Sequence, residues 1–330
     1  MYEEKTIAAV VPAYNEEPFI GEVIADLPEF VDRAYVIDDR STDGTWAEIQ
    51  KHAGDDEAES HVPTPDGGVA PATIVPIRHE QNRGVGGAIK TGYQRALEDG
   101  VDAAVVIAGD GQMEPDIVER VLEPVADGRA DYSKGNRLLH RDRDRMPRFR
   151  RFGNFLLSLI TKIASGYWKL NDPQNGATAI SRNALETVDI DALYEDYGFA
   201  NDLLVRLNVH GMRVAEVPHR PVYKDETSHI KYSTFIPKTS TLLLQRFLWR
   251  LKEKYLVRDF HPLAFFYYLG AAATATGVVG GFRSLLSDGT GSERSSSVVL
   301  FVFGWLLMLF AMVFDMRESE ELELLVDDEE

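Results

Sequence analysis

Two long uncharged segments near the C-terminus constrain this chain more than any other feature. Residues 262–282 and 298–314 contain no Asp, Glu, Lys or Arg, and each is close to the roughly 20 residues that a helix needs to cross a bilayer. A short polar linker, residues 283–297, separates them. The pattern predicts a hairpin of two transmembrane helices over residues 261–316, with a pair of buried core helices as the alternative.

Basic residues are concentrated before the first of these segments, whereas the linker holds only Arg283 and Arg294. The positive-inside rule then places the N-terminal part and the acidic tail, residues 317–330, in the cytoplasm of a multi-pass membrane protein. The N-terminus shows no signal-peptide pattern, which agrees with this placement. The basic residues that precede the first segment are Lys238, Arg246, Arg250, Lys252, Lys254 and Arg258.

Apolar residues at helical spacing are mixed with basic ones between residues 241 and 260. This pattern is typical of a helix that lies on a membrane surface, and we expect a juxtamembrane helix within residues 236–260. A helix packed against the soluble domain is the alternative.

The charge balance is strongly acidic, with 53 acidic and 35 basic residues and a net charge of −18. This disfavours nucleic acid as a partner, because phosphate backbones are bound by Lys and Arg. The acidic residues are scattered along the sequence, which favours the solvated surface of a halophilic protein over an acidic recognition surface. The absence of cysteine excludes disulfides and thiolate nucleophiles.

Short apolar runs alternate with amphipathic stretches in residues 1–235. This alternation predicts an α/β domain with a mostly parallel sheet and helices on both faces, apart from an exposed insertion at residues 54–71. In such sheets, ligands bind beyond the carboxyl ends of the strands. The expected strands cover residues 6–11, 33–37, 73–77 and 103–107, and the expected helices cover residues 17–27, 45–53, 84–98 and 115–126.

Polar residues and glycines follow the ends of all four expected strands. Carboxylates at such positions can accept hydrogen bonds from a ribose or a base, or hold a hard cation on a diphosphate. Glycines at a helix start let a backbone approach an anionic ligand. Each motif alone is also an ordinary turn, but together they predict a nucleotide site. The segments are Pro12-Ala13-Tyr14-Asn15-Glu16, Asp38-Asp39, Gly84-Val85-Gly86-Gly87 and Gly109-Asp110-Gly111-Gln112.

The order and spacing of these motifs resemble those of family 2 inverting glycosyltransferases. Within that family the chain is most similar to the polyprenyl-phosphate glycosyltransferases typified by dolichyl-phosphate mannose synthase. The resemblance covers about residues 5–235 and implies a GT-A type fold. It rests on four motifs: Pro12-Ala13-Tyr14-Asn15-Glu16, Asp38-Asp39-x-Ser41-x-Asp43-Gly44-Thr45, Asn82-x-Gly84-x-Gly86 and Gly109-Asp110-Gly111-Gln112.

The resemblance implies a nucleotide-diphosphate-sugar donor, GDP-mannose or UDP-glucose, bound with Mg²⁺ or Mn²⁺. Asp110 and Gln112 would hold the metal, but Ala108 stands where the family usually has Asp, so one oxygen ligand is lost. The residues implied for the base and ribose are Pro12, Tyr14, Glu16, Asp38 and Asp39, with Gly84 in the glycine turn. A segment with Tyr223, Ser228 and Lys231 resembles a loop that closes over the donor, with His229 where lysine is common.

The resemblance also implies an acceptor region. Arg137, in Lys134-Gly135-Asn136-Arg137, and Arg151, at the end of an arginine-rich stretch, would bind the acceptor phosphate, since arginine matches phosphate oxygens in bidentate fashion. The segment Asp172-Pro173-Gln174-Asn175-Gly176 would lie near the sugar, and Asp202 near the acceptor.

We therefore expect a membrane-bound haloarchaeal enzyme that transfers a hexose, with inversion, to dolichyl or polyprenyl phosphate for protein N-glycosylation. One alternative is a glycosyltransferase that extends a glycan hydroxyl with Asp202 as the base. Another, of a different class, is an inactive membrane-tethered binding or scaffold relative, which Ala108 favours.

Overall fold

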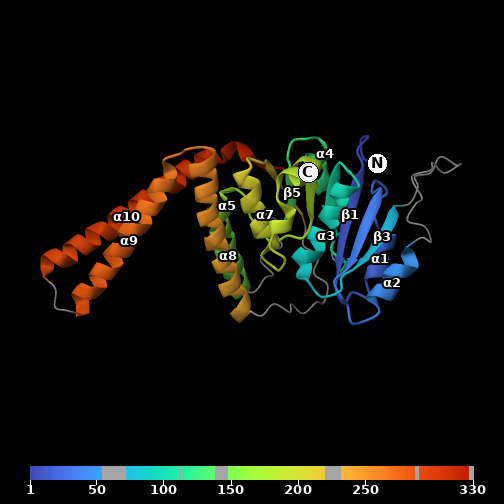
Figure 1. Cartoon of the computed structure of the whole chain (residues 1–330), viewed down its shortest axis with the longest axis horizontal. Coiled ribbons are helices and arrows are strands. Elements are labelled where there is room, and N and C mark those ends of the chain that lie inside the picture. The colour runs from blue at the N-terminus through green and yellow to red at the C-terminus, as the bar shows by residue number, and fades with distance from the viewer. Residues whose placement is uncertain are drawn as a thin grey trace.

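A computed structural model of the chain describes residues 1–53, 72–111, 113, 115–137, 148–219, 232–286 and 290–326 (Figure 1). Several positions from the sequence analysis lie outside the described residues. These are the insertion at 54–71, Gln112, most of the arginine-rich stretch, and Tyr223, Ser228, His229 and Lys231.

The core of the molecule is an eight-stranded sheet with the strand order β3-β2-β1-β4-β6-β5-β7-β8. The four strands expected from the sequence form its parallel half, and β6 is antiparallel to both of its neighbours, so β5 and β7 point the same way as β4. The strands are β1 (Ile7–Ala13), β2 (Arg33–Asp38), β3 (Thr73–Arg78), β4 (Ala103–Val106), β5 (Tyr132–Asn136), β6 (Thr178–Ser181), β7 (Val214–Pro218) and β8 (Glu323–Leu325).

The helices cover both faces of the sheet, as expected for an α/β domain. One face carries α1 (Ile20–Ala25), α2 (Thr45–His52) and α4 (Pro115–Ala126), and the other carries α3 (Gly84–Glu98), α6 (Arg182–Thr187), the short 3₁₀ helix η2 (Ile190–Ala192) and α7 (Phe199–Val209). α3 and α4 have the bounds that the sequence predicts.

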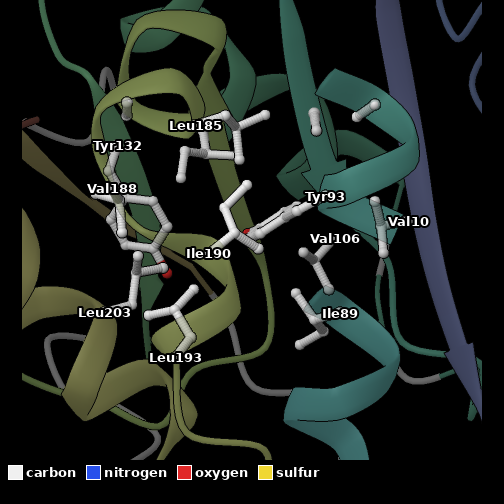
Figure 2. Packing of buried hydrophobic residues seen from close by; sticks show 14 of the residues in the cluster. Val10, Ile89, Tyr93, Val106, Tyr132, Leu185, Val188, Ile190, Leu193 and Leu203 are labelled. Carbon is white, nitrogen blue, oxygen red and sulfur yellow. The ribbon is translucent and has the colours of Figure 1, made fainter. Parts of the chain in front are cut away.

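Alternate residues of each central strand lie in two separate hydrophobic cores, because successive side chains of a strand point to opposite faces of the sheet. Val10 and Val106 pack with Ile89 and Tyr93 of α3 (Figure 2), while Val11 lies in the core of the other face. Full burial of each such side chain contributes about 1.5–3 kcal/mol. Both faces are therefore buried, and the open edge at the strand ends is left for polar residues.

A second layer of helices packs on α7. It consists of α5 (Arg148–Ser165) and α8 (Tyr232–Lys252), and α8 continues as the π-helix η3 (Glu253–Arg258). A helix is thus present where the sequence predicts one, but it begins earlier in the chain. Leu243 of α8 is buried against α5 and α7, and Leu251 is buried against the ends of the hairpin helices that lie nearest the domain. Leu244 and Leu248, in contrast, are exposed. The helix therefore packs on the domain, as the alternative interpretation expects, and its outer face is apolar.

The two uncharged segments form α9 (Leu263–Leu286) and α10 (Gly291–Glu318), two antiparallel helices that project from the domain (Figure 1). Small residues face the partner helix, including Gly277 and Gly304, and a methyl group on Gly277 would lie 2.6 Å from the backbone nitrogen of Phe301. Large side chains such as Val298 and Phe310 point outward and are exposed. Close packing of small residues with apolar side chains outside is typical of helices surrounded by lipid, and it argues against a pair of soluble-core helices.

The chain returns from the hairpin to the sheet. After α10 and the 3₁₀ helix η4 (Glu320–Leu322), β8 pairs in parallel with β7, with Val214 opposite Glu323. The sequence predicts only an acidic tail here. Both ends of the hairpin are therefore attached to the same domain, one through α8 and one through β8.

Candidate active site

The ends of β1, β2 and β4 meet at one edge of the sheet, as their parallel arrangement requires. The backbone N–H of Asp39 donates to Ala13 O at 2.9 Å, and that of Gly109 donates to Pro12 O at 3.3 Å. A methyl group on Gly109 would lie 2.9 Å from Pro12 O, so only glycine allows this approach. The structure thereby brings together the segments that carry Pro12, Asp39 and Asp110.

The loops after β1 and β2 are joined by side chains of the expected motifs. Ser41 Oγ accepts the N–H of Asn15, and Thr45 Oγ1 accepts the N–H of Glu16. Asn15 itself has a left-handed backbone conformation with φ 58°. Its side-chain Oδ1 accepts the backbone N–H of Thr42 in the loop after β2. This arrangement leaves the Tyr14 side chain 47% exposed at the edge, where a nucleotide base could stack on it.

Asp38 and Asp39 are both almost fully buried. Asp38 accepts the N–H of Ser41 at 2.9 Å and forms an ion pair with Arg78, also at 2.9 Å. Asp39 Oδ1 accepts the N–H of Arg83 and contacts Nδ1 of His79, and its Oδ2 accepts the N–H of Gly84, all at 2.7 Å. Asp39 therefore caps the start of α3.

The glycine turn after β3 lies against protein, which differs from what the sequence predicts. The expected reason for these glycines is close approach of a ligand, but the space beside them holds protein. A methyl group on Gly84 would lie 2.8 Å from Glu195 O, and one on Gly86 would lie 2.8 Å from Tyr194 O. The N–H of Gly87 also donates to Glu195 O. The glycines let α3 pack against the segment before α7, and with Asp39 they leave little of this helix start for an anion.

Asp110 lies in the turn after β4 and is partly exposed. Among the described residues, no group of three or more His, Cys, Asp or Glu could form a preformed metal cage. The absence of a carboxylate at Ala108 is consistent with this. One carboxylate still fits Mg²⁺ or Mn²⁺, because Mg²⁺ commonly takes one or two protein carboxylates and completes its shell with water and substrate phosphates.

The ends of β5 and β7 and the start of β6 lie at the same edge and carry a basic group. Arg137 donates to both carboxylate oxygens of Asp172, from Nε at 2.8 Å and from Nη2 at 3.0 Å. Burial opposes ionisation of Asp172, but the Arg137 guanidinium, together with Lys134 and Asn175, outweighs burial and holds the pKa of this carboxyl well below its usual range. The Arg137 side chain is 41% exposed, so one face can meet a ligand while Asp172 fixes the other.

The remaining expected acceptor residues have different surroundings. Arg151 lies in the first turn of α5, and its side chain is outside the described residues. Asp202 is fully buried in α7. Its carboxylate pairs with Arg246 at 2.6 Å and Arg206 at 3.4 Å and accepts the N–H of Tyr194 at 2.9 Å. This placement argues against Asp202 as a base for a substrate hydroxyl, and indicates that it holds α8 against α7.

Sequence reasoning missed two residues that organise this edge. His79 bridges Asp39 and Thr91, and its position directly after β3 could have drawn attention to it. Glu195 binds Arg83 at 2.7 Å and Lys90 at 2.9 Å, and these two cations lower its pKa to about 2. Glu195 lies in an irregular segment far from its partners in the chain, and no local pattern marks it.

Comparisons with known proteins agree with this geometry. The sequence model of the family described as glycosyl transferase family 2 matches residues 8–189. The chain is 31% identical over 224 residues to the UDP-N-acetylglucosamine–dolichyl-phosphate N-acetylglucosaminyltransferase of Methanococcus voltae, covering 67% of this chain and 88% of that protein. It is 26% identical over 234 residues to the dolichyl-phosphate hexose transferase of Haloferax volcanii, covering 71% and 90%. Among solved structures, mannosyl-3-phosphoglycerate synthase from Rubrobacter xylanophilus is similar in fold, with a TM-score of 0.52, 19% identity, and 78% and 77% of the two chains covered.

Proposed function

Because this chain belongs to glycosyl transferase family 2, we propose that it transfers a hexose from a nucleotide-diphosphate sugar to a polyprenyl phosphate such as dolichyl phosphate, with inversion. The relatives in Methanococcus voltae and Haloferax volcanii are named for transfer to dolichyl phosphate, which supports this acceptor. Lipid-linked sugar of this kind would supply protein N-glycosylation.

The donor would lie across the ends of β1, β2 and β4. Tyr14 would stack on the base, with Pro12 and Glu16 beside it and Asp38 and Asp39 shaping the floor. Asp110 and Gln112 would hold Mg²⁺ or Mn²⁺ on the diphosphate. A bound divalent cation would neutralise charge on the leaving diphosphate.

The acceptor phosphate would meet the exposed face of Arg137, and Arg151 is the second candidate for this contact. Arg137 is held in position by Asp172, so its exposed side would meet phosphate oxygens with little loss of side-chain entropy. An open groove of about 400 Å³ between Tyr194 and the N-terminal half of α8 could admit the lipid headgroup.

The chemistry needs no base from the protein. A lipid monophosphate is largely dianionic near neutral pH, since its second pKa is about 6. Its oxygen would form a bond to the anomeric carbon while the bond from that carbon to the nucleotide diphosphate breaks, which inverts the centre. The task of the enzyme is then to align two phosphates and offset their repulsion.

The membrane would be met by the hairpin and by the outer faces of α5 and α8, which lie side by side (Figure 1). Phe155 and Leu159 of α5 and Leu244 and Leu248 of α8 are all exposed. With both ends of the hairpin attached to one domain, two crossings would leave that domain on one side, the cytoplasmic side by the positive-inside rule. The acceptor headgroup would then be presented next to the sheet edge.

The observation that carries this proposal is the pairing of Arg137 with Asp172 at the same edge as Asp110. The test is to incubate membranes that contain the protein with a panel of labelled nucleotide sugars, extract the lipids and identify the labelled product. Label in a polyprenyl-phosphate sugar is the expected result. Label only in a glycan would favour the hydroxyl-acceptor alternative, and no transfer of any sugar would favour the inactive scaffold.

A further inference from the structure

The strand that returns from the membrane hairpin holds the turn that leads to Asp172. Glu323 of β8 accepts the backbone N–H of Trp168 through Oε1 and that of Lys169 through Oε2, both at 2.5 Å. Two consecutive N–H groups are thus bound by the two oxygens of one carboxylate. Hydrogen bonds to an ionised acceptor are among the stronger ones in proteins.

The neighbouring strand continues this arrangement. Glu216 of β7 is fully buried, pairs with Lys134 at 2.6 Å, and accepts the backbone N–H of Asn171 at 2.7 Å. β8 is bonded to β7 at this point, because the N–H of Val326 donates to Glu216 O at 3.0 Å. Two glutamates on adjacent strands therefore bind three backbone N–H groups between residues 168 and 171.

The next residue in the chain is the partner of Arg137. Asp172 has a left-handed backbone with φ 40°, an uncommon conformation for a residue with a side chain, which persists when its surroundings fix it. Its carboxylate binds the guanidinium and the backbone N–H of Arg137. The position of Arg137 is thus linked through Asp172 to a turn whose preceding residues are bound by β8 and β7.

We propose that the C-terminal strand is a positioning element of the acceptor-phosphate site: Glu323 fixes the turn at Trp168–Lys169 so that Asp172 aligns Arg137. Residues that follow the second membrane helix by only a few positions would in this way contribute to acceptor recognition in the domain at the other end of the chain. This inference rests on the proposed function for the role of Arg137, but not for the geometry of the turn.

The geometry is tested by amide hydrogen exchange of the full-length protein in lipid nanodiscs, comparing Glu323→Ala with the unmodified chain. The control is Glu321→Ala, which changes an exposed glutamate of the same tail. We expect faster exchange at residues 168–172 in Glu323→Ala alone, with unchanged exchange in β1 and β2. Unchanged exchange at residues 168–172 would overturn the inference.

The role in recognition is tested by steady-state kinetics of the same variants. We expect Glu323→Ala to raise the KM for polyprenyl phosphate about tenfold, the effect of losing one charge-assisted hydrogen bond, and to leave the KM for the nucleotide sugar unchanged. Glu323→Gln retains one acceptor oxygen and should give an intermediate KM. Equal changes in both KM values, or none in either, would refute a positioning role. If the unmodified chain transfers nothing to polyprenyl phosphate, the proposed function fails, and hydrogen exchange alone then decides whether Glu323 fixes the turn.

Discussion

A buried ion pair joins α8 to the hairpin of α9 and α10, and removing one of its partners should destabilise the protein by a predictable amount. Arg250 of α8 is fully buried and donates to both oxygens of Asp315 in α10, at 2.8 and 2.7 Å. It also donates to Ala164 O at 2.9 Å and Ile163 O at 3.0 Å, at the end of α5. Arg250→Met would remove all of these interactions. The Asp315 carboxylate would stay buried, with a hydrogen bond from the Tyr255 hydroxyl but without its cationic partner.

The size of the effect follows from the burial of both charges. Breaking a buried pair by removing one partner typically costs about 3–5 kcal/mol, because the other charge is left uncompensated. The two α5 carbonyls would add up to about 1–3 kcal/mol each if nothing else bonds them. Replacing both charges by apolar residues, as in Arg250→Met with Asp315→Leu, removes the uncompensated charge. The double variant should therefore be more stable than Arg250→Met alone, although it still lacks the carbonyl bonds.

The assay is unfolding in a mild detergent, followed by intrinsic tryptophan fluorescence, for the unmodified chain, the two single variants and the double variant. We expect a coupling free energy of about 3 kcal/mol in the double-mutant cycle, the lower bound for such a pair. Lys252→Met, at an exposed position of the same helix, is the matched control and should be nearly neutral. Additive effects of the two single variants would show that neither charge compensates the other in the folded protein.

Four further predictions concern the site and the hairpin. Asp172→Asn should raise the KM for the acceptor about tenfold in steady-state assays, through loss of a charge-assisted bond to Arg137. The folded state favours ionisation of Asp172 and so lowers its pKa. The ionised carboxyl should therefore contribute its full stabilisation above about pH 4, and this contribution should decline as the pH falls further. Acid unfolding of the unmodified chain, compared with that of Asp172→Asn, measures the difference in stability. Gly277→Leu should separate α9 from α10 and lower the unfolding temperature, whereas Gly291→Leu, with open space around it, should not. Chelation of divalent cations should abolish transfer, and activity that survives complete chelation would contradict the metal assignment. Asp110→Asn should raise the Mg²⁺ concentration for half-maximal activity about tenfold, which is equivalent to about 1.4 kcal/mol of binding free energy.

The parallel half of the sheet and the hairpin could be predicted because their signals are local. The expected helix at residues 84–98 matches α3, and the expected strand at residues 33–37 matches β2 with one residue added. The uncharged segments are long enough to be recognised by composition alone. In each case a single stretch of sequence carries the whole pattern.

The parts that were missed depend on contacts between distant segments. β8 has only three residues, and nothing in Glu323-Leu324-Leu325 indicates that it returns to pair with β7. The role of Asp202 depends on Arg246, a residue that the sequence pattern places among membrane-facing charges. The glycines at 84 and 86 were recognised as positions of close approach, but the approaching group, Glu195, is more than a hundred residues away.

The proposed function requires an acceptor phosphate that Arg137 binds directly. The most direct measurement uses the purified full-length chain in lipid bilayers and compares transfer of label to polyprenyl phosphate with transfer to the corresponding polyprenol. The labelled donor is the nucleotide sugar that supports transfer in the donor panel described above. We expect transfer to the phosphate alone, and a large loss of that transfer in Arg137→Gln. Equal transfer to the free alcohol would show that the acceptor phosphate is not required, and full activity of Arg137→Gln would show that Arg137 does not bind it.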